Sequence, residues 1–220
     1  MDGEKPRRPP RATSPGTIVL DVPVFGQREA ECGNTSLKAV LWHLGRRVSA
    51  AELARLAGAD RDGINHAGLV AAAGRAGAAV FERAGGSLAE LRWFLGRGHP
   101  VIVGWWSLDP GDHHFDPAWS LAERRQRDCG HFSVVIGIDT TRLLLMDPQW
   151  ERRGGRWRVV GRRWMPHATF RRAWYDTDTD AYQRVVRWYL VAHHSGERFA
   201  HRFGGGTDHD RDADAVRASG

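Results

Sequence analysis

The sequence has few cysteines, almost no lysine and no long apolar run. Its 220 residues include 2 cysteines, Cys32 and Cys129, too few for the disulfide scaffold of a small secreted domain. No apolar stretch approaches the roughly 18 residues that a membrane-spanning helix requires. The first ten residues are rich in proline and arginine and lack the apolar core of a signal peptide. These absences predict a cytoplasmic protein with reduced cysteines and no membrane partner.

The scarcity of lysine changes how the basic charge is interpreted. Only Lys5 and Lys38 are lysines, so arginine supplies the remaining 30 of the 32 basic residues, and the formal net charge is +6. A basic balance can indicate a nucleic-acid partner. Here the arginines are spread along the chain among 26 acidic residues, which favours a solvated surface. We therefore expect no nucleic-acid partner, and an arginine-rich nucleic-acid binder remains the minor alternative.

The ends of the chain differ in composition from its centre. Residues 1–16 are rich in proline, arginine and serine, and residues 196–220 contain a glycine triplet followed by an Asp/Arg/His-rich stretch. Both segments predict disordered tails, because they offer little apolar surface to bury. Residues 17–195 contain enough apolar side chains for one domain of ordinary size.

Apolar periodicity divides this domain into a helical half and a strand-rich half. After Cys32, apolar residues recur at helical spacing. Ser49 and Ser87 each precede a glutamate by three residues, as in capping boxes, and a further helix is expected near Asn65. The predicted strands are 79–81, 101–106, 132–138, 143–146 and 185–191, with tight turns at 139–141 and 154–155. Helices followed by consecutive strands predict an α+β fold with an antiparallel sheet.

Cys32 is the strongest candidate for a catalytic residue. It precedes a predicted helix directly, and the free N–H groups and positive dipole end of a helix N-terminus favour the thiolate over the thiol. The same N–H groups can bind an oxyanion. Gln27, five residues earlier, has a side-chain amide that could donate to that oxyanion.

His131 and Asp147 are expected to complete a triad with Cys32. His131 lies at the start of one predicted strand, and Asp147 follows the next strand after a tight turn. Antiparallel pairing of the two strands would bring these side chains together, with His131 as the base and Asp147 as its orienting carboxylate.

Alternative roles for the same residues remain open. Cys32, Cys129 and His131 could bind zinc with His113 or His114 as a fourth ligand, although the spacing matches no known finger. Cys129 could also form a reversible disulfide with Cys32. A passive buried thiol is the more common role for such a cysteine. We expect neither a metal nor a cofactor.

Four motifs resemble the papain-like bacteriocin-processing peptidases, which remove double-glycine leader peptides, and their stand-alone relatives. The motifs are Val22-Pro23-Val24-Phe25-Gly26-Gln27, Cys32-Gly33-Asn34-Thr35-Ser36-Leu37, residues 130–139 (Gly-His-Phe-Ser-Val-Val-Ile-Gly-Ile-Asp) and Leu145-Met146-Asp147-Pro148. The resemblance covers about residues 19–192 and implies a papain-like fold with the same four site residues. Many members place the glutamine six residues before the cysteine, and have proline where this chain has Asn34.

We therefore interpret the chain as a papain-like cysteine peptidase acting on an extended peptide or protein substrate through Cys32, His131, Asp147 and Gln27. The alternative is a catalytically inactive peptide-binding module of the same fold. The sequence indicates neither the substrate, nor the oligomeric state, nor whether water or another acceptor takes the acyl group.

Overall fold

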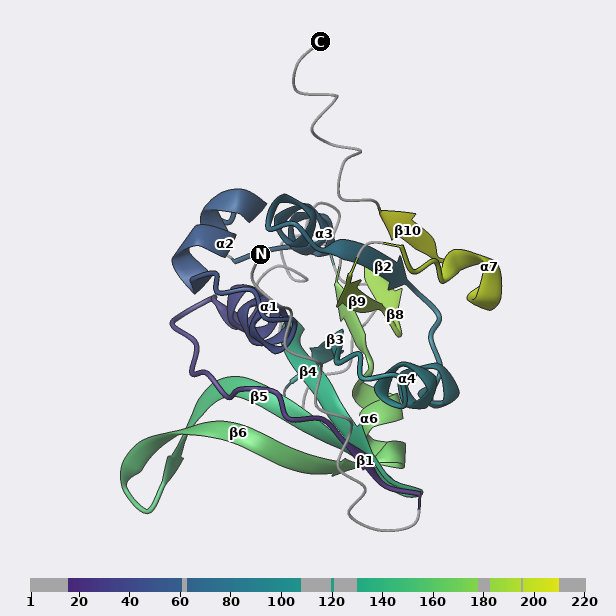
Figure 1. The fold of residues 1–220 in the computed structure, drawn as a ribbon. Helices are drawn as coiled ribbons and strands as arrows, with labels where there is room; N and C mark the ends of the chain where they lie inside the picture. The colour runs from purple at the N-terminus through teal and green to yellow at the C-terminus, as the bar shows by residue number, and fades with distance from the viewer. Residues whose placement is uncertain are drawn as a thin grey trace.

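The computed structural model of the chain describes residues 16–60, 63–107, 120, 130–177, 183–194 and 196–209. Within these ranges, four helices and two short strands come first and most of the strands follow, so the predicted α+β class is confirmed (Figure 1). The helices are α1 (Cys32–His43), α2 (Ala50–Ala57), α3 (His66–Arg75) and α4 (Leu88–Leu95). None of the described helices has the length and apolar character that crossing a membrane requires.

Side-chain caps explain where three of these helices begin. Ser49 accepts a hydrogen bond from the Glu52 N–H at 3.1 Å, and Asn65 accepts one from the Gly68 N–H at 2.7 Å. Ser87 and Glu90 form a reciprocal capping box, each side chain accepting from the backbone N–H of the other. The predicted helix starts at these positions are confirmed.

An antiparallel sheet runs through the molecule in the order β10-β2-β9-β3-β4-β5-β6, and β1 pairs with β4 outside this path. Its central strands are almost wholly buried. The strands are β1 (Ile18–Val19), β2 (Ala79–Arg83), β3 (Val101–Trp106), β4 (Gly130–Ile138), β5 (Arg142–Arg153), β6 (Arg156–Pro166), β9 (Tyr189–His193) and β10 (Thr207–His209).

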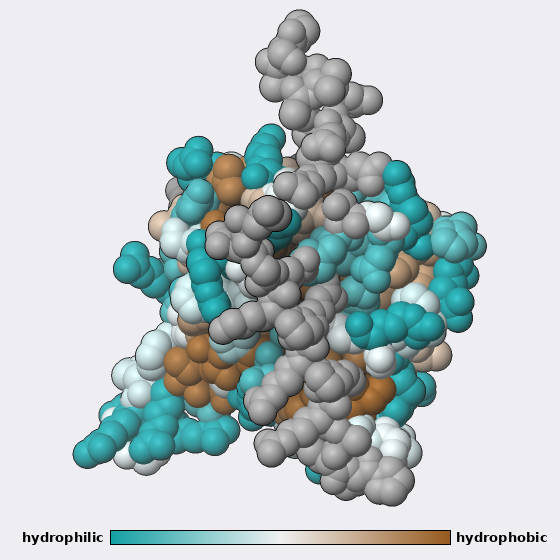
Figure 2. Space-filling view, in the orientation of Figure 1, coloured by the Kyte–Doolittle hydropathy of each residue, from teal (hydrophilic) through white to brown (hydrophobic). Residues whose placement is uncertain are grey.

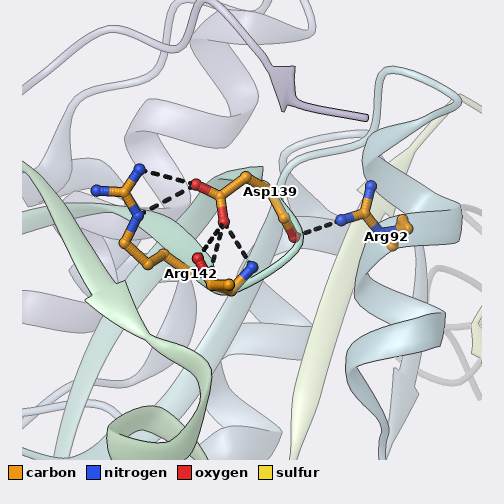
Figure 3. A network of polar contacts seen from close by, with 4 residues as sticks. Arg92, Asp139 and Arg142 are labelled. Atoms are coloured by element: carbon orange, nitrogen blue, oxygen red, sulfur yellow. Dashed lines mark hydrogen bonds and ion pairs between the residues drawn. The ribbon is translucent and has the colours of Figure 1, made fainter. Parts of the chain in front are cut away.

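A network at the turn between β4 and β5 sets the register of these two strands. The Asp139 carboxylate accepts hydrogen bonds from the backbone N–H groups of Thr141 and Arg142 at 2.7 and 2.6 Å, and pairs with the Arg142 guanidinium (Figure 3). Arg92 of α4 donates to the Asp139 carbonyl oxygen. The hydrogen bonds from Thr141, the largest cause, and from Arg142 lower the pKa of Asp139 to about 2. The turn therefore keeps β5 beside β4.

Helix α1 packs on β4 and joins the two halves of the chain. Leu37, Val40 and Leu41 of the helix are fully buried in the same core as Val134 and Leu145 of the sheet. The Ser36 hydroxyl donates to the Phe132 carbonyl oxygen at 3.1 Å. This bond lies one turn after Cys32 and one residue after His131, so it fixes the start of α1 relative to the start of β4.

Two expected elements differ from the structure. The predicted strand 185–191 is divided into β8 (Arg184–Val186) and β9, because Arg187 adopts a left-handed conformation with φ 54°. Strand β8 then pairs with β7 (Tyr175–Thr177), which follows α6 (His167–Ala173). The predicted strand 143–146 is only the first part of β5, which begins at Arg142 and continues to Arg153.

The expected domain boundary at residue 195 also needs correction. Residues 196–209 contain α7 (Ala200–Phe203) and β10, and β10 pairs with β2 at the edge of the main sheet. Phe199 is buried against Phe81, Phe94 and His193, with ring centroids 4.9 to 5.9 Å apart. Phe203 also packs on Phe81, Trp93 and Phe94, so this polar segment contains two aromatic residues that hold it to the core. Residues 1–15 and 210–220, also predicted to be tails, lie outside the described residues.

Beyond Asp147, β5 pairs only with β6, and the two strands form an arm that extends past the rest of the sheet (Figure 1). A bulge between Asp147 and Trp150 marks its start. We call residues 149–159 the arm; its first residues adjoin the candidate site.

Candidate active site

Cys32 is the first residue of α1 and is partly exposed. Glu31 precedes it at the cap position, but its side chain makes no capping hydrogen bond to the helix. Gly33 allows the helix to begin here, because a Cβ at that position would lie 2.2 Å from Cγ2 of the buried Ile64. The thiol therefore stands at a helix N-terminus without a side-chain cap, and the chain around it is closely packed.

His131 and Asp147 form a buried hydrogen-bonded pair. His131 Nε2 lies 2.8 Å from Asp147 Oδ1, and both side chains are about 5% exposed or less. The Gln149 N–H donates to the same carboxylate oxygen at 3.1 Å. Asp147 Oδ2 lies 3.2 Å from an Arg163 guanidinium nitrogen of β6. Pairing between β4 and β5 thus brings together the two residues that the sequence placed on neighbouring strands.

The surroundings of His131 favour its charged form. Burial lowers the pKa of His131, but hydrogen bonds to Asp147 and Cys32, together with the charges on both side chains, outweigh burial and raise the pKa from 6.5 to about 10. Because Nε2 faces Asp147, Nδ1 is the ring nitrogen left for Cys32. The contacts with Asp147 and Cys32 therefore favour the imidazolium form of His131 at neutral pH.

Asp147 is held as a carboxylate by its neighbours. Burial raises its pKa, but the hydrogen bond and charge of His131, the Gln149 N–H and the Arg163 guanidinium bring the pKa below its ordinary value. The arginine also lies over the Trp105 ring, with its guanidinium carbon 5.3 Å from the ring centroid. The Trp105 ring in turn meets the His131 ring edge-on at 5.7 Å. Arg163 and Trp105 thus enclose the His131–Asp147 pair.

Gln27 lies beside Pro148, the residue that follows Asp147. Its backbone N–H donates to the Pro148 carbonyl at 2.9 Å, and its own carbonyl accepts from Trp150 Nε1 at 2.8 Å. The preceding Gly26 packs so closely that a Cβ would lie 2.7 Å from Val159 Cγ2. The side-chain Oε1 of Gln27 is buried and has no hydrogen-bond partner among the described residues. The Gln27 backbone is therefore fixed to β5, whereas its side-chain Oε1 makes no hydrogen bond with the described residues.

Sequence reasoning missed the supporting residues Ser36, Trp105 and Arg163. An arginine near Asp147 could have been suspected, because a tight turn at Gly154-Gly155 folds β6 back along β5, but the turn alone does not select Arg163 over Arg162. No comparable signal exists for Ser36, which looks like an ordinary helix residue.

Two of the alternatives depend on residues beyond the described part of the chain. Cys129, His113 and His114 lie outside it, so the zinc and disulfide hypotheses stay predictions. Among the residues that are described, no group of three or more His, Cys, Asp or Glu side chains is arranged to hold a metal ion.

The arrangement is that of a papain-like peptidase domain: a helix beginning at a cysteine packs on an antiparallel sheet that carries a histidine–aspartate pair. The crystal structure of a double glycine motif protease from an AMS/PCAT transporter in complex with the leader peptide has a TM-score of 0.50 and 21% identity, covering 79% of this chain and 92% of that one. The crystal structure of a putative C39-like peptidase from Bacillus anthracis has a TM-score of 0.55 and 18% identity, and the match covers 80% of this chain and 96% of that one.

The chain belongs to the Peptidase_C39 like family, whose sequence profile matches residues 19–182. An uncharacterized protein of Methanothermobacter thermautotrophicus is 31% identical over 137 residues, which cover 62% of this chain and 76% of the relative. The resemblance stated from the four motifs is therefore confirmed at the level of family and fold.

Proposed function

We propose that this protein is a cysteine peptidase that cleaves a peptide bond in an extended segment of its substrate. The observation that carries the proposal is the hydrogen bonding of His131 to both Asp147 and Cys32. An imidazolium in contact with a cysteine at a helix N-terminus is the arrangement that stabilises a thiolate nucleophile. We expect the activity in the cytoplasm, where thiols stay reduced.

In this proposal, the Cys32 thiolate attacks the scissile carbonyl carbon and forms a tetrahedral intermediate. The imidazolium of His131 donates a proton to the departing amine as the carbon–nitrogen bond breaks, leaving a thioester on Cys32. Neutral His131 then removes a proton from water, which attacks the thioester carbon; the carbon–sulfur bond breaks, the acid is released, and the Cys32 thiolate and the His131 imidazolium are restored. Asp147 holds the imidazole in place and stabilises its charged form in each step.

The oxyanion of both tetrahedral intermediates needs donors that are in place before the reaction. We propose the Cys32 backbone N–H and the Gln27 side-chain amide for this role. The hydrogen bonds of the Gln27 backbone to Pro148 and Trp150 support it, because they join Gln27 to the strand that carries Asp147.

The substrate is proposed to be a peptide on the strength of the family and fold. The double glycine motif protease was crystallised with a leader peptide. For this chain we propose only the broader class, an extended peptide segment, since no described feature selects glycine at the cleavage site.

The proposal is tested by labelling the protein with a small peptide-like thiol electrophile at neutral pH and measuring intact mass. We expect one fast label that disappears in Cys32→Ala, persists in Cys129→Ala and slows strongly in His131→Ala. Slow labelling, at a rate that does not change in His131→Ala, would contradict the proposal and favour the inactive peptide-binding module. Cleavage is then sought with a peptide library, using Cys32→Ala as the control for contaminating proteases.

A further inference from the structure

The arm of residues 149–159 has two unlike faces. Cross-strand partners project to the same face of a two-stranded ribbon. Trp150 pairs with Val159, and Arg152 pairs with Trp157, so these four residues share one face, which we call the tryptophan face. The opposite face contains Glu151, Arg153, Arg156 and Arg158.

The tryptophan face is directed toward the candidate site. Trp150 and Val159 both approach Gly26, and Trp150 Nε1 donates to the carbonyl of Gln27. Farther along the same face, Trp157 is 66% exposed, the most exposed large apolar side chain among the described residues. An aromatic surface therefore begins beside the proposed oxyanion donor and ends in an uncovered tryptophan ring.

The arm is positively charged, because it contains four arginines and only one acidic residue. Its single acidic residue, Glu151, already pairs with Arg153. The exposed Arg152, Arg156 and Arg158 form no ion pair with any described residue. Figure 2 shows hydrophilic side chains over the projecting end of β5 and β6, beside a hydrophobic patch where these strands join the body. The arm thus combines an exposed aromatic ring with guanidinium groups that have no ion-pair partner in the described part of the chain.

We propose that the tryptophan face of the arm binds an acidic segment of the peptide substrate, several residues away from the bond that is cleaved. This inference rests on the proposed peptidase function and specifies its substrate class. Trp157 provides a flat apolar surface for an extended chain, and Arg152 beside it pairs with a carboxylate. The arginines of the opposite face attract the same segment at longer range.

The geometry sets the spacing of the acidic segment. Asp147 pairs with Gly161, and Trp157 lies four residues before Gly161 on β6, which has no extra residue at the bulge. Because a strand rises about 3.3 Å per residue, roughly 13 Å separates Asp147 from Trp157 along the sheet, and an extended substrate covers this distance with about four residues.

A peptide is favoured over a nucleic acid because the surface is continuous with the site. Strand β5 carries Asp147 in its middle and Arg152 near its end, and Trp150 between them donates a hydrogen bond to the Gln27 carbonyl. A ligand on the tryptophan face is therefore directed toward Cys32, where the proposed substrate is a peptide. Nucleic-acid binding and self-association are outcomes that the test distinguishes.

The test measures binding to the Cys32→Ala protein, which cannot turn the ligand over. The probes are peptides of about twelve residues, long enough in extended form to reach from the site to the arm. They carry a neutral fluorophore and a run of glutamates at either end of a Gly/Ser/Ala sequence. Matched peptides have glutamine in place of glutamate. Each is titrated by fluorescence anisotropy at low and high salt.

We expect one of the glutamate peptides to bind at least about fivefold more tightly than its glutamine counterpart, with the difference shrinking at high salt. Adding Trp157→Ala, or separately Arg152→Glu, should lower the affinity for the glutamate peptide about fivefold to tenfold. Trp164→Ala and Arg172→Glu are the matched controls, since both residues are exposed and lie off the arm, and binding should be unchanged in them.

Three results would overturn the proposal. The first is equal binding of glutamate and glutamine peptides. The second is a single-stranded oligonucleotide that binds more tightly than either peptide and loses affinity in the Trp157→Ala variant. The third is a dimer in light scattering that this variant dissociates. Fast labelling of Cys32 in the wild type, combined with any of these, would leave the peptidase proposal intact and reject only the arm as its docking surface.

Discussion

Asp147 determines how strongly His131 holds its proton. Its carboxylate raises the pKa of His131 through a hydrogen bond and through its charge, against the effect of burial. Asn at this position keeps the shape and removes the charge, so the His131 pKa falls in Asp147→Asn. Because the imidazolium is present only below that pKa, the alkaline limb of the labelling rate, expected near pH 10 in the wild type, moves to lower pH.

The measurement is the rate of Cys32 labelling from pH 6 to pH 11. We expect the Asp147→Asn rate at neutral pH to drop about tenfold or more, as the imidazole loses its charged partner. Gln149→Ala is the control, because its backbone N–H bond to Asp147 does not require the side chain. An alkaline limb at the same pH in Asp147→Asn would show that the carboxylate does not set the His131 pKa.

Arg163 acts on the site through Asp147. Its charge lowers the Asp147 pKa, so removing it in Arg163→Gln raises that pKa, and the carboxylate becomes protonated at a higher pH. The arginine side chain is 36% exposed, so solvent screens the pair and the expected loss of labelling rate is about fivefold at most.

The loss should be larger at acid than at neutral pH, and Arg163→Lys should restore part of it. Arg162→Gln is the matched control, since the neighbouring arginine pairs with Asp21 at the surface. A pH-independent loss in Arg163→Gln would indicate a purely structural role.

At the residue scale, the sequence was sufficient to predict that His131 and Asp147 lie close together. His131 and Asp147 could be paired in advance because a short turn connects their strands. Arg163 could not be selected over Arg162, because the bulge after Asp147 shifts the pairing of β5 with β6 by one residue; Pro148 is compatible with a bulge but does not give the size of the shift. The catalytic roles themselves stay predictions until the labelling is done.

At the scale of elements, the start of α1 depends on a glycine. Adding a Cβ in Gly33→Ala places a methyl group 2.2 Å from Ile64 Cγ2 and 3.2 Å from Phe132 Cδ2. Since both neighbours are buried, we expect the free energy of unfolding to fall by roughly 1–3 kcal/mol in urea.

Two variants separate this steric cost from a general effect of alanine. Ile64→Ala removes the clashing atom, so the double variant should lose less stability than the sum of the single changes. Gly74→Ala adds a methyl group to α3 where no atom lies within 4 Å, and should gain about 0.5–1 kcal/mol. Equal losses in Gly33→Ala and Gly74→Ala would contradict the packing argument.

Strand pairing was harder to predict than helix position. Capping side chains marked the starts of α2, α3 and α4 directly. The division of residues 184–193 into β8 and β9 depends on the left-handed Arg187, a conformation that arginine rarely adopts and that the apolar pattern does not reveal.

At the scale of the whole molecule, residues 196–209 close the edge of the sheet. Phe199 is buried among aromatic rings of β2 and α4, and β10 pairs with β2. A chain ending after Gly196 loses both, so we expect it to unfold at lower urea, with a loss of roughly 3 kcal/mol or more from the missing phenylalanine alone.

A chain ending after His209 retains every described contact of this segment and is the control. Urea unfolding followed by tryptophan fluorescence provides the comparison. Equal midpoints for the two truncated chains would restore the original boundary at residue 195.

The separation of the site residues along the chain has a consequence for how the protein is made. His131 and Asp147 are 16 residues apart on one hairpin, so a short loop closure brings them together early. Cys32 is synthesised long before either and meets them only when α1 docks on β4 through contacts such as the Ser36–Phe132 bond. A nascent chain on the ribosome therefore carries a cysteine without its imidazole. In the proposed chemistry, proteolytic activity therefore appears only after α1 has docked on β4, and an unfinished copy cannot cleave its neighbours.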